Sequence, residues 1–290
     1  MKLTNKNNLP LPIVRAMESM EAAYDAGRGG SDYSTTGLLL PPRIAQLRRQ
    51  HGAELVEDAA DRLWSLYGQI AHRILYESAE GHVAELRLNC DFNGITVSGQ
   101  VDLVEGDTLT DYKFVTRYAT KDGVKDEWVQ QGQINRLLCE RSGIPIKKIQ
   151  YVAMYRDWSK LAAEREQEYP PEIEQFDIPL WDMDKTRAFI EERIRLHEAA
   201  KVELPLCSAE ERWQDPARWA LMKKGAKRAV KLYNAEHEAQ AAAANAEQIP
   251  GVSKNYSVEP RPSIPKRCMH YCPVSAYCSQ GRELLREYSE

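Results

Sequence analysis

The chain has 290 residues, of which 43% are apolar and 28% charged, and its net charge is −4 at pH 7. This composition is typical of a soluble globular protein with one large domain, or with one domain and an appendage. Because the net charge is negative, any contact with nucleic acid must depend on a local basic patch. No apolar run approaches the ~20 residues that span a bilayer, and the N-terminus has no signal-peptide pattern. We therefore expect no membrane partner and a cytoplasmic location.

The first 80 residues carry helical patterns. Residues 1–30 indicate a short helix and then a loop. Pro41 and Pro42 suit the first turn of a second helix. Residues 53–80 repeat apolar side chains at three- and four-residue spacing, which predicts one or two helices with Gly68 at a close approach or a break.

Residues 83–115 instead alternate apolar and polar side chains, with turn signals at Asn93-Gly94 and Gly106-Asp107. This pattern predicts three antiparallel strands, roughly at 83–91, 95–104 and 108–115. A helix over about 127–141 and a fourth, central strand in "KKIQYVAMYRDW" follow.

The C-terminal third is expected to be mostly helical. Residues 182–202 predict a helix that Asp182 or Asp184 caps. Residues 218–247 are also read as mostly helical, because their alanine-rich end has high helix propensity. The Pro-rich stretch from 248 to 267 should be extended.

Asp102, Asp111 and Lys113 fall on two neighbouring strands of the predicted hairpin. Alternate residues of a strand share a face, so Asp111 and Lys113 project together and Asp102 can lie across from them. Two carboxylates on adjacent strands suit Mg²⁺ or Mn²⁺. On this segment alone, the alternative of a solvent-facing charged hairpin is the stronger one.

Two flanking helices add polar side chains to this hairpin. His72 stands in the preceding helix among apolar neighbours, and Gln130, Gln131 and Gln133 stand in the following one. Taken singly, the histidine reads as a core residue and the amides as solvated side chains.

The ordered set resembles the PD-(D/E)XK nuclease superfamily, specifically its RecB-like branch, over about residues 34–158. The matching positions lie on a helix, two strands and a second helix, and they are Gly68, His72 and Glu77; Gly99 and Asp102; Asp111 and Lys113; and Gln131. The resemblance implies an α/β (α+β) fold: a restriction-endonuclease-like core at 34–180 with a small mixed central sheet flanked by helices. Residues 1–33 would be an N-terminal segment, and 181–290 a mainly helical extension with a cysteine-cluster tail.

The resemblance also implies a role for each site residue. The Mg²⁺ or Mn²⁺ ligands would be His72, Asp102, Asp111 and the backbone carbonyl of Tyr112. Lys113 would be the catalytic lysine, and Gln131 would position it or the substrate. Glu85, on the first strand, is a weaker member of the site.

One position departs from the family pattern. Asn135 stands where the family often has tyrosine. This leaves Gln130 or Gln133 open as the functional amide if the register slips.

Cys268, Cys272 and Cys278 form a C-x3-C-x5-C pattern near the C-terminus. Clustered thiolates bind one soft metal or cluster, either Zn²⁺ with His270 as a fourth ligand or a [4Fe-4S] cluster with a fourth thiolate. Three unrelated buried cysteines are the simpler alternative. Several RecB-like nucleases carry a similar triplet on an iron–sulfur cluster, and by that resemblance Cys207 is the expected fourth ligand.

Five cations lie within nine residues of a segment that is predicted to be helical, and they are Lys223, Lys224, Lys227, Arg228 and Lys231. On a helix, four of these cations, at 224, 227, 228 and 231, share one face. A basic helix face can contact the phosphates of a nucleic acid without recognising its base sequence, although a solvated helix face is an equally good explanation. A second possible basic site consists of Arg43, Arg48 and Arg49.

The resemblance implies a metal-dependent DNA nuclease, with an exonuclease acting on DNA ends or single strands as the favoured form. Its contexts are DNA recombination, repair and phage DNA processing, which would place a phage-encoded chain in the host cytoplasm. A homo-oligomer or a recombination partner protein is possible. The alternatives are a DNA-binding or scaffold subunit that keeps the fold without hydrolysis, and an unrelated zinc-stapled protein whose hairpin is only structural.

Overall fold

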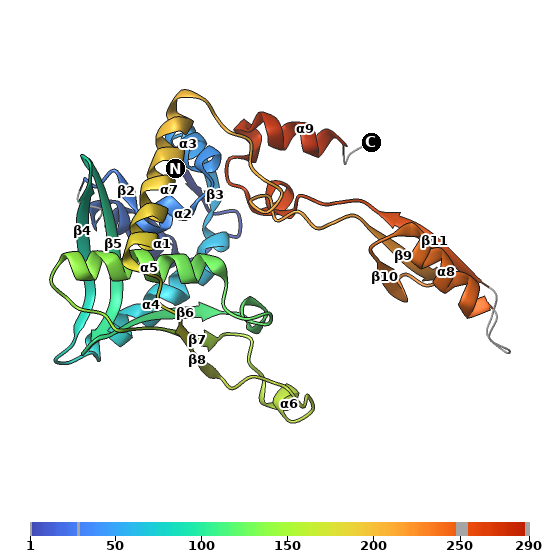
Figure 1. Cartoon of the computed structure of the whole chain (residues 1–290), viewed down its shortest axis with the longest axis horizontal. Coiled ribbons are helices and arrows are strands. Elements are labelled where there is room, and N and C mark those ends of the chain that lie inside the picture. Colours follow the sequence, from blue (N-terminus) through green and yellow to red (C-terminus); the bar gives the residue numbers. More distant parts are fainter. Residues whose placement is uncertain (1, 28–29, 248–254, 288–290) are drawn as a thin grey trace. The chain divides into compact units, whose positions relative to one another are not determined.

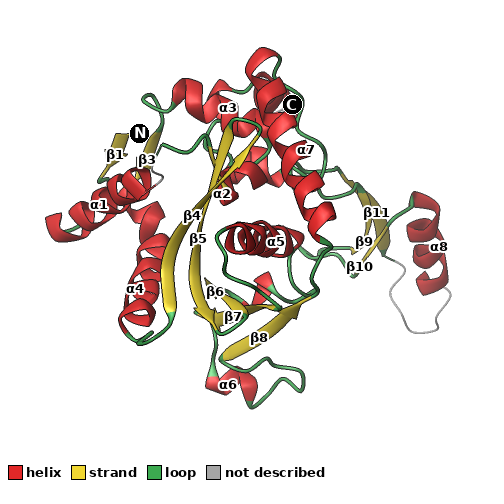
Figure 2. Cartoon of the chain, turned by 60° about the vertical axis from the view of Figure 1, so that its left-hand side comes forward, coloured by secondary structure: helices red, strands yellow, loops and turns green. Residues whose placement is uncertain are grey.

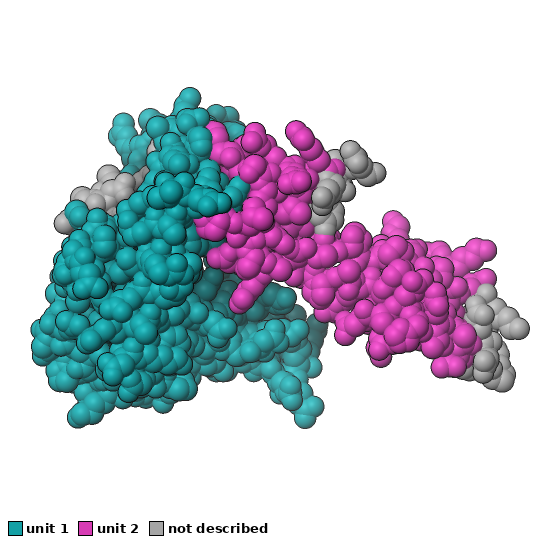
Figure 3. All heavy atoms as spheres, turned by 45° about the horizontal axis from the view of Figure 1, so that its top comes forward, with its two compact units in different colours: residues 1–204 teal, residues 205–290 magenta. Residues whose placement is uncertain are grey.

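A computed structural model describes residues 2–27, 30–247 and 255–287. The chain divides into two compact units, Met1–Leu204 and Pro205–Glu290, which are coloured separately in Figure 3. The domain boundaries expected from the sequence, after residues 33 and 180, are not tested by this division and stay predictions. Among the described residues, no helix combines the length and apolar character needed to cross a membrane.

Unit 1 is built around a six-stranded mixed sheet, labelled in Figure 1. Its strands are β2 (Tyr33–Ser34), β4 (Val83–Phe92), β5 (Ile95–Glu105), β6 (Thr108–Val115), β7 (Lys148–Tyr155) and β8 (Ile173–Ile178). The order is β2-β5-β6-β7-β8, and β4 pairs with β5 beside this path. Neighbours are antiparallel except for the β2–β5 and β6–β7 pairs, which are parallel. The expected mixed α/β fold with a central mixed sheet is therefore confirmed.

The predicted three-stranded stretch is confirmed within one residue at each strand end. The Asn93-Gly94 turn allows this, because both residues adopt the positive φ angles of a tight hairpin, +53° and +87°. β7 is the predicted fourth strand. Alternate residues of β7 are buried, as expected for a strand covered by helices on one face.

Helices flank the sheet on both sides. The helices of unit 1 are α1 (Leu11–Gly27), α2 (Thr35–Leu39), α3 (Pro42–His51), α4 (Leu63–Glu77), α5 (Asp126–Arg141), α6 (Lys160–Ala163) and α7 (Met183–Val202). Figure 2 shows α5 in the hollow of the curved sheet and α4 on its outer side. Ile134 and Leu138 of α5 pack into the core with Val97 and Val101 of β5. α5 is therefore the central helix of the unit.

Two glycines allow α5 to lie this close to the strands. A Cβ added at Gly99 would lie 2.6 Å from both Asn135 Oδ1 and Leu138 Cδ1. A Cβ at Gly132 would lie 3.0 Å from Ile149 Cγ2. A side chain at Gly99 would force Asn135 and Leu138 to shift, and one at Gly132 would be tightly packed, so glycine favours the close approach at both positions.

The start of α3 at Pro42 and the cap of α7 agree with the sequence. Asp182 accepts a hydrogen bond from Asp184 N, which caps α7. The segment 53–80 is more divided than expected. It contains a short strand β3 (Val56–Asp58), a 3₁₀ turn at Ala59–Arg62, and then α4. The expectation for Gly68 is wrong, because it lies inside α4 and an added Cβ there would meet open space.

Unit 2 contains a three-stranded antiparallel sheet as well as helices. The elements are β9 (Arg218–Lys223), β10 (Lys231–Tyr233), α8 (Glu236–Glu247), β11 (Tyr256–Arg261) and α9 (Ser279–Glu287), with the strand order β10-β9-β11. The expected helix over 218–247 is therefore wrong in its first half. Pairing with a remote segment overrides the local propensity there. The expected extended stretch from 248 is a strand from Tyr256, and residues 248–254 lie outside the described residues. β11 tolerates Pro260 because it is an edge strand.

Candidate metal centre

The candidate site lies where the β5–β6 ladder ends and where one residue pair of the β4–β5 ladder is missing. The β5–β6 ladder pairs Leu103 with Thr110 and stops there, although Asp102 and Asp111 would be the next pair. The β4–β5 ladder pairs residues on either side of Glu85 and Asp102 but not these two. Asp102 Oδ2 instead accepts the backbone N–H of Tyr112 across 2.8 Å. The carboxylate therefore replaces a ladder hydrogen bond at this point.

Glu85 interrupts β4 because its backbone is left-handed, with φ at +50°. This conformation is uncommon for a residue with a side chain and costs free energy that the surrounding strands must offset. Leu86 resumes the pairing directly after it. The residue that leaves the β4–β5 ladder is thus the one whose side chain contacts His72.

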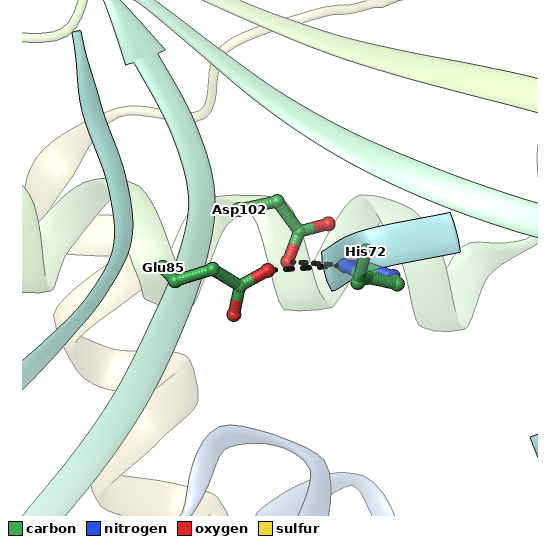
Figure 4. A group of neighbouring side chains, drawn as sticks. All are labelled: His72, Glu85 and Asp102. Carbon is green, nitrogen blue, oxygen red and sulfur yellow. Dashed lines mark hydrogen bonds and ion pairs between the residues drawn. The ribbon is translucent and has the colours of Figure 1, made fainter. Parts of the chain in front are cut away.

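His72, Glu85 and Asp102 converge from α4, β4 and β5 (Figure 4). His72 Nδ1 lies 3.2 Å from Glu85 Oε1 and 3.6 Å from Asp102 Oδ1. One potential ligand atom from each of the three residues lies within 4.8 Å of the others. One imidazole nitrogen and two carboxylates form a donor set that suits a divalent cation such as Mn²⁺ or Mg²⁺.

Asp111, Lys113 and Gln131 form a second polar group beside this set. Lys113 Nζ lies 2.6 Å from Asp111 Oδ1. Gln131 donates from Nε2 to Asp111 Oδ2 across 2.9 Å and accepts from Lys113 Nζ at Oε1 across 3.1 Å. Asp111 is buried, and among the described atoms no hydrogen bond to Oδ1 accompanies the ion pair. This oxygen already faces the Lys113 ammonium, so a metal ion bound to Asp111 would share the carboxylate with Lys113.

The two groups differ from the ligand set that the resemblance implied. Glu85, expected as a weaker member, lies with His72 and Asp102. Asp111, expected as a ligand, is outside that three-residue set and is paired with Lys113. Tyr112 lies between the two groups, and its N–H is bound by Asp102.

The electrostatics of the site reflect crowded negative charge. Burial, and then the charge of Asp111, raise the pKa of Asp102 to about 7, against the opposing effects of His72, the Tyr112 N–H and Lys113. The hydrogen bond to Glu85 raises the pKa of His72, although burial opposes this shift. A bound divalent cation would relieve the repulsion between the carboxylates and would displace a proton from Asp102.

Three contributors to the site were missed from the sequence. Trp128 and Tyr151 stack at 5.5 Å, and Lys113 Nζ lies 5.9 and 5.3 Å from the centres of their rings. Gln100 donates from Nε2 to Glu85 and accepts at Oε1 from Arg87. Only Gln100 had a sequence signal, because it lies two residues before Asp102 on the same strand face.

The remaining residues of the matched pattern lie elsewhere. Glu77 is exposed and pairs with Arg73 across 2.7 Å. Gln133 is buried and bonds to the backbone of Pro179 and Trp181. Of the amides left open by the sequence, Gln131 is the one hydrogen-bonded to Asp111 and Lys113 within the described part of the chain.

The cysteines proposed as cluster ligands lie in unit 2: Cys207, Cys268, Cys272 and Cys278. Within the described residues, no three of their sulfurs lie within 4.8 Å of one another. Burial raises the pKa of Cys268, and nearby Cys272 and Cys278 raise it further. Gln280 of α9 bonds to both the N–H and the carbonyl of Cys207. The structure thus gives no support for a closed cluster, and His270 is exposed.

Fold and site define a mixed α/β protein with a candidate His/Glu/Asp metal centre. No family model matches the sequence, and none of the curated proteins compared with it matches either. One solved structure that is similar is described as SSO0001, with a TM-score of 0.44 and 16% identity over 63% of this chain and 84% of the other. Another is an alkaline exonuclease (LHK-Exo) from Laribacter hongkongensis, with a TM-score of 0.36 and 15% identity over 62% of this chain and 93% of the other. Likeness at this level is distant, and the function below is argued from the site.

Proposed function

We propose that this chain is a metal-dependent nuclease that hydrolyses phosphodiester bonds of DNA. The observation that carries the proposal is the convergence of His72, Glu85 and Asp102 where the β4–β5 ladder skips one residue pair. The ordered resemblance of these positions to RecB-like nucleases supports the same reading. A fully solvated hairpin would leave its carboxylates exposed and unperturbed, whereas burial and Asp111 raise the pKa of Asp102 to about 7.

Mg²⁺ or Mn²⁺ would be held by His72, Asp102, Asp111 and the carbonyl of Tyr112, with Glu85 as a further oxygen ligand. When bound, the ion supplies Lewis acidity toward a phosphate and lowers the pKa of a bound water. His72 must present an unprotonated nitrogen, so the ion competes with the proton that Glu85 stabilises on the ring.

Lys113 is the proposed catalytic cation, and it would neutralise charge that develops on a phosphate oxygen. Its Nζ is held between Asp111 and Gln131, which fixes the direction of its N–H groups. The rings of Trp128 and Tyr151 lie within 6 Å of it. Their low polarity strengthens the interaction of Lys113 with an anion.

We further propose a [4Fe-4S] cluster on Cys207, Cys268, Cys272 and Cys278, with Zn²⁺ on the triplet and His270 as the alternative. A single zinc ion with ligands at 2.3 Å requires sulfurs about 3.8 Å apart. A four-iron cubane holds its thiolates farther apart than one zinc ion does, so it is the first choice for sulfurs of which no three lie within 4.8 Å of one another in the described residues. Iron, sulfide and zinc analysis of anaerobically purified protein decides between the two, and absence of all three overturns both.

More specifically, we propose an exonuclease that acts on DNA ends or single strands. Recombination, repair and phage DNA processing are its contexts, with a cytoplasmic or host-cytoplasmic location. A homo-oligomer or a recombination partner protein remains part of this proposal.

A nuclease assay tests the main proposal. End-labelled linear DNA and closed circular DNA are incubated with the protein and Mn²⁺, beside an Asp111→Asn variant. If the wild type degrades only the linear DNA and the variant degrades neither, the result supports an exonuclease. Cutting of the circular DNA supports an endonuclease. Equal degradation, or none, with both proteins overturns the proposed nuclease and favours the DNA-binding scaffold subunit.

A further inference from the structure

A hairpin of unit 2 presents a basic end that the proposed nuclease site does not use. The loop from 224 to 230 joins β9 to β10. It turns through Gly225, whose φ is +81°, and Ala226 N donates to Lys223 O across 2.9 Å. Strand pairing resumes where Val230 N donates to Leu221 O across 2.8 Å. The loop is therefore a defined turn with hydrogen bonds at both ends.

The hairpin concentrates positive charge. Its five cations are all exposed: Lys223, Lys224, Lys227, Arg228 and Lys231. No acidic residue occurs between Arg218 and Tyr233. Within the part of the chain that the structure describes, none of the five cations forms an ion pair with a carboxylate. Since the whole chain carries −4 and these residues carry +5, the rest of the chain carries −9.

Strand register places both ends of the loop on one side of the sheet. Lys231 is the cross-strand partner of Leu221, so their side chains share a face. Lys223 follows Leu221 by two residues and shares that face as well. The loop cations Lys224, Lys227 and Arg228 lie between these two ends in the sequence. The five cations therefore all belong to the β9–β10 turn and the strand ends next to it.

We propose that this hairpin is a second nucleic-acid contact, which binds the phosphate backbone without reading the base sequence. Flexible, exposed lysines suit phosphates as point charges, and a single planar Arg228 among them adds a bidentate donor. The inference rests on the proposed function only in taking DNA as the polymer. The negative charge of the rest of the chain repels DNA, so a local basic surface has a large share of any affinity.

Salt dependence of binding tests the inference. Full-length Asp111→Asn protein in EDTA is titrated against a fluorescent single strand and its duplex, and compared with the same protein carrying Lys224→Gln, Lys227→Gln and Arg228→Gln. If each of the three contacts one duplex phosphate, the slope of log Kd against log salt falls by about 2.7. Between about 50 and 200 mM salt, the parent then loses about 40-fold more affinity than the variant. A thermal unfolding transition equal to that of the parent shows that the variant is folded.

The matched control removes three exposed cations from α7 in unit 1, through Lys185→Gln, Arg187→Gln and Arg195→Gln. This variant has the same net charge as the hairpin variant. A slope that falls only in the hairpin variant supports the inference. Equal slopes in parent and hairpin variant, or equal losses in both variants, overturn it. Binding in EDTA needs no hydrolysis, so failure of the nuclease assay and failure of the hairpin contact are separate results.

Discussion

Asp102 on β5 accepts a hydrogen bond from the backbone N–H of Tyr112 on β6, 2.8 Å away, at the point where the two strands separate. The side chain therefore holds the strands together while the backbone pairing has ended. It also keeps one oxygen, Oδ1, directed to His72. A single carboxylate thus joins the structure of the sheet to the candidate metal centre.

The raised pKa of Asp102 predicts how stability depends on pH. Its folded value of about 7 lies above the ordinary value of 3.8, so the folded chain binds the proton more tightly than the unfolded chain. The contribution of Asp102 to metal-free stability is therefore present at low pH and is lost as pH rises from about 4 to about 7, by a few kcal/mol at most. Asp102→Asn should remove this loss, measured as the difference in unfolding free energy between wild type and variant at pH 5 and pH 8.

The difference in unfolding free energy between the two proteins is the useful quantity, because other groups titrate in the same pH range. The pKa of His72 is also raised, first by the hydrogen bond to Glu85 and in part by Asp102, so the difference includes the part of the His72 contribution that depends on Asp102, and this part has the same sign. Burial lowers the pKa of His197 to about 4, so its contribution is lost as pH falls below about 6.5. A wild-type minus variant difference that is constant with pH would contradict the assignment for Asp102.

Glu85 should contribute directly to cation affinity. Glu85→Gln removes one charge from the three-residue set and should weaken Mn²⁺ binding by at least about 10-fold, measured by calorimetry. Glu77→Gln is the matched control, because Glu77 is exposed on the neighbouring helix and pairs with Arg73. Equal affinities for the two variants would exclude Glu85 as a ligand.

We expect Gln131 to act as a positioning residue, because it holds Lys113 and Asp111 by hydrogen bonds. Gln131→Ala should lower kcat by about 10- to 100-fold and change KM little, because ground-state binding does not require it. Gln130→Ala is the control one residue earlier in α5. A rise in KM with unchanged kcat would instead make Gln131 a substrate-binding residue.

A side chain at Gly99 should destabilise the fold. Gly99→Ala would place a Cβ 2.6 Å from Asn135 Oδ1 and Leu138 Cδ1, and should cost about 1–3 kcal/mol of unfolding free energy. Gly68→Ala is the opposite case, because its Cβ would meet open space within a helix and should stabilise by up to about 1 kcal/mol. Denaturant unfolding of both variants measures the contrast, and a neutral Gly99→Ala would show that α5 can shift.

The sequence determined the elements whose signals are local. Alternation and the Asn93-Gly94 turn place β4 and β5, and Asp182 caps α7 because capping depends on a few adjacent residues. Asp102, Asp111 and Lys113 could be singled out for the same reason, since period-2 spacing along strands sets their relative directions.

The tertiary structure alone decided which of these groups meet. Glu85 joins His72 and Asp102 only through a left-handed backbone angle and the register of β4. The residues next to Glu85 in the sequence predict neither feature. Residues 218–233 form a hairpin rather than a helix because β9 pairs with the remote strand β11. Trp128 and Tyr151 stack beside Lys113 for a similar reason. Contacts between distant segments depend on packing and on hydrogen bonds that no local pattern encodes.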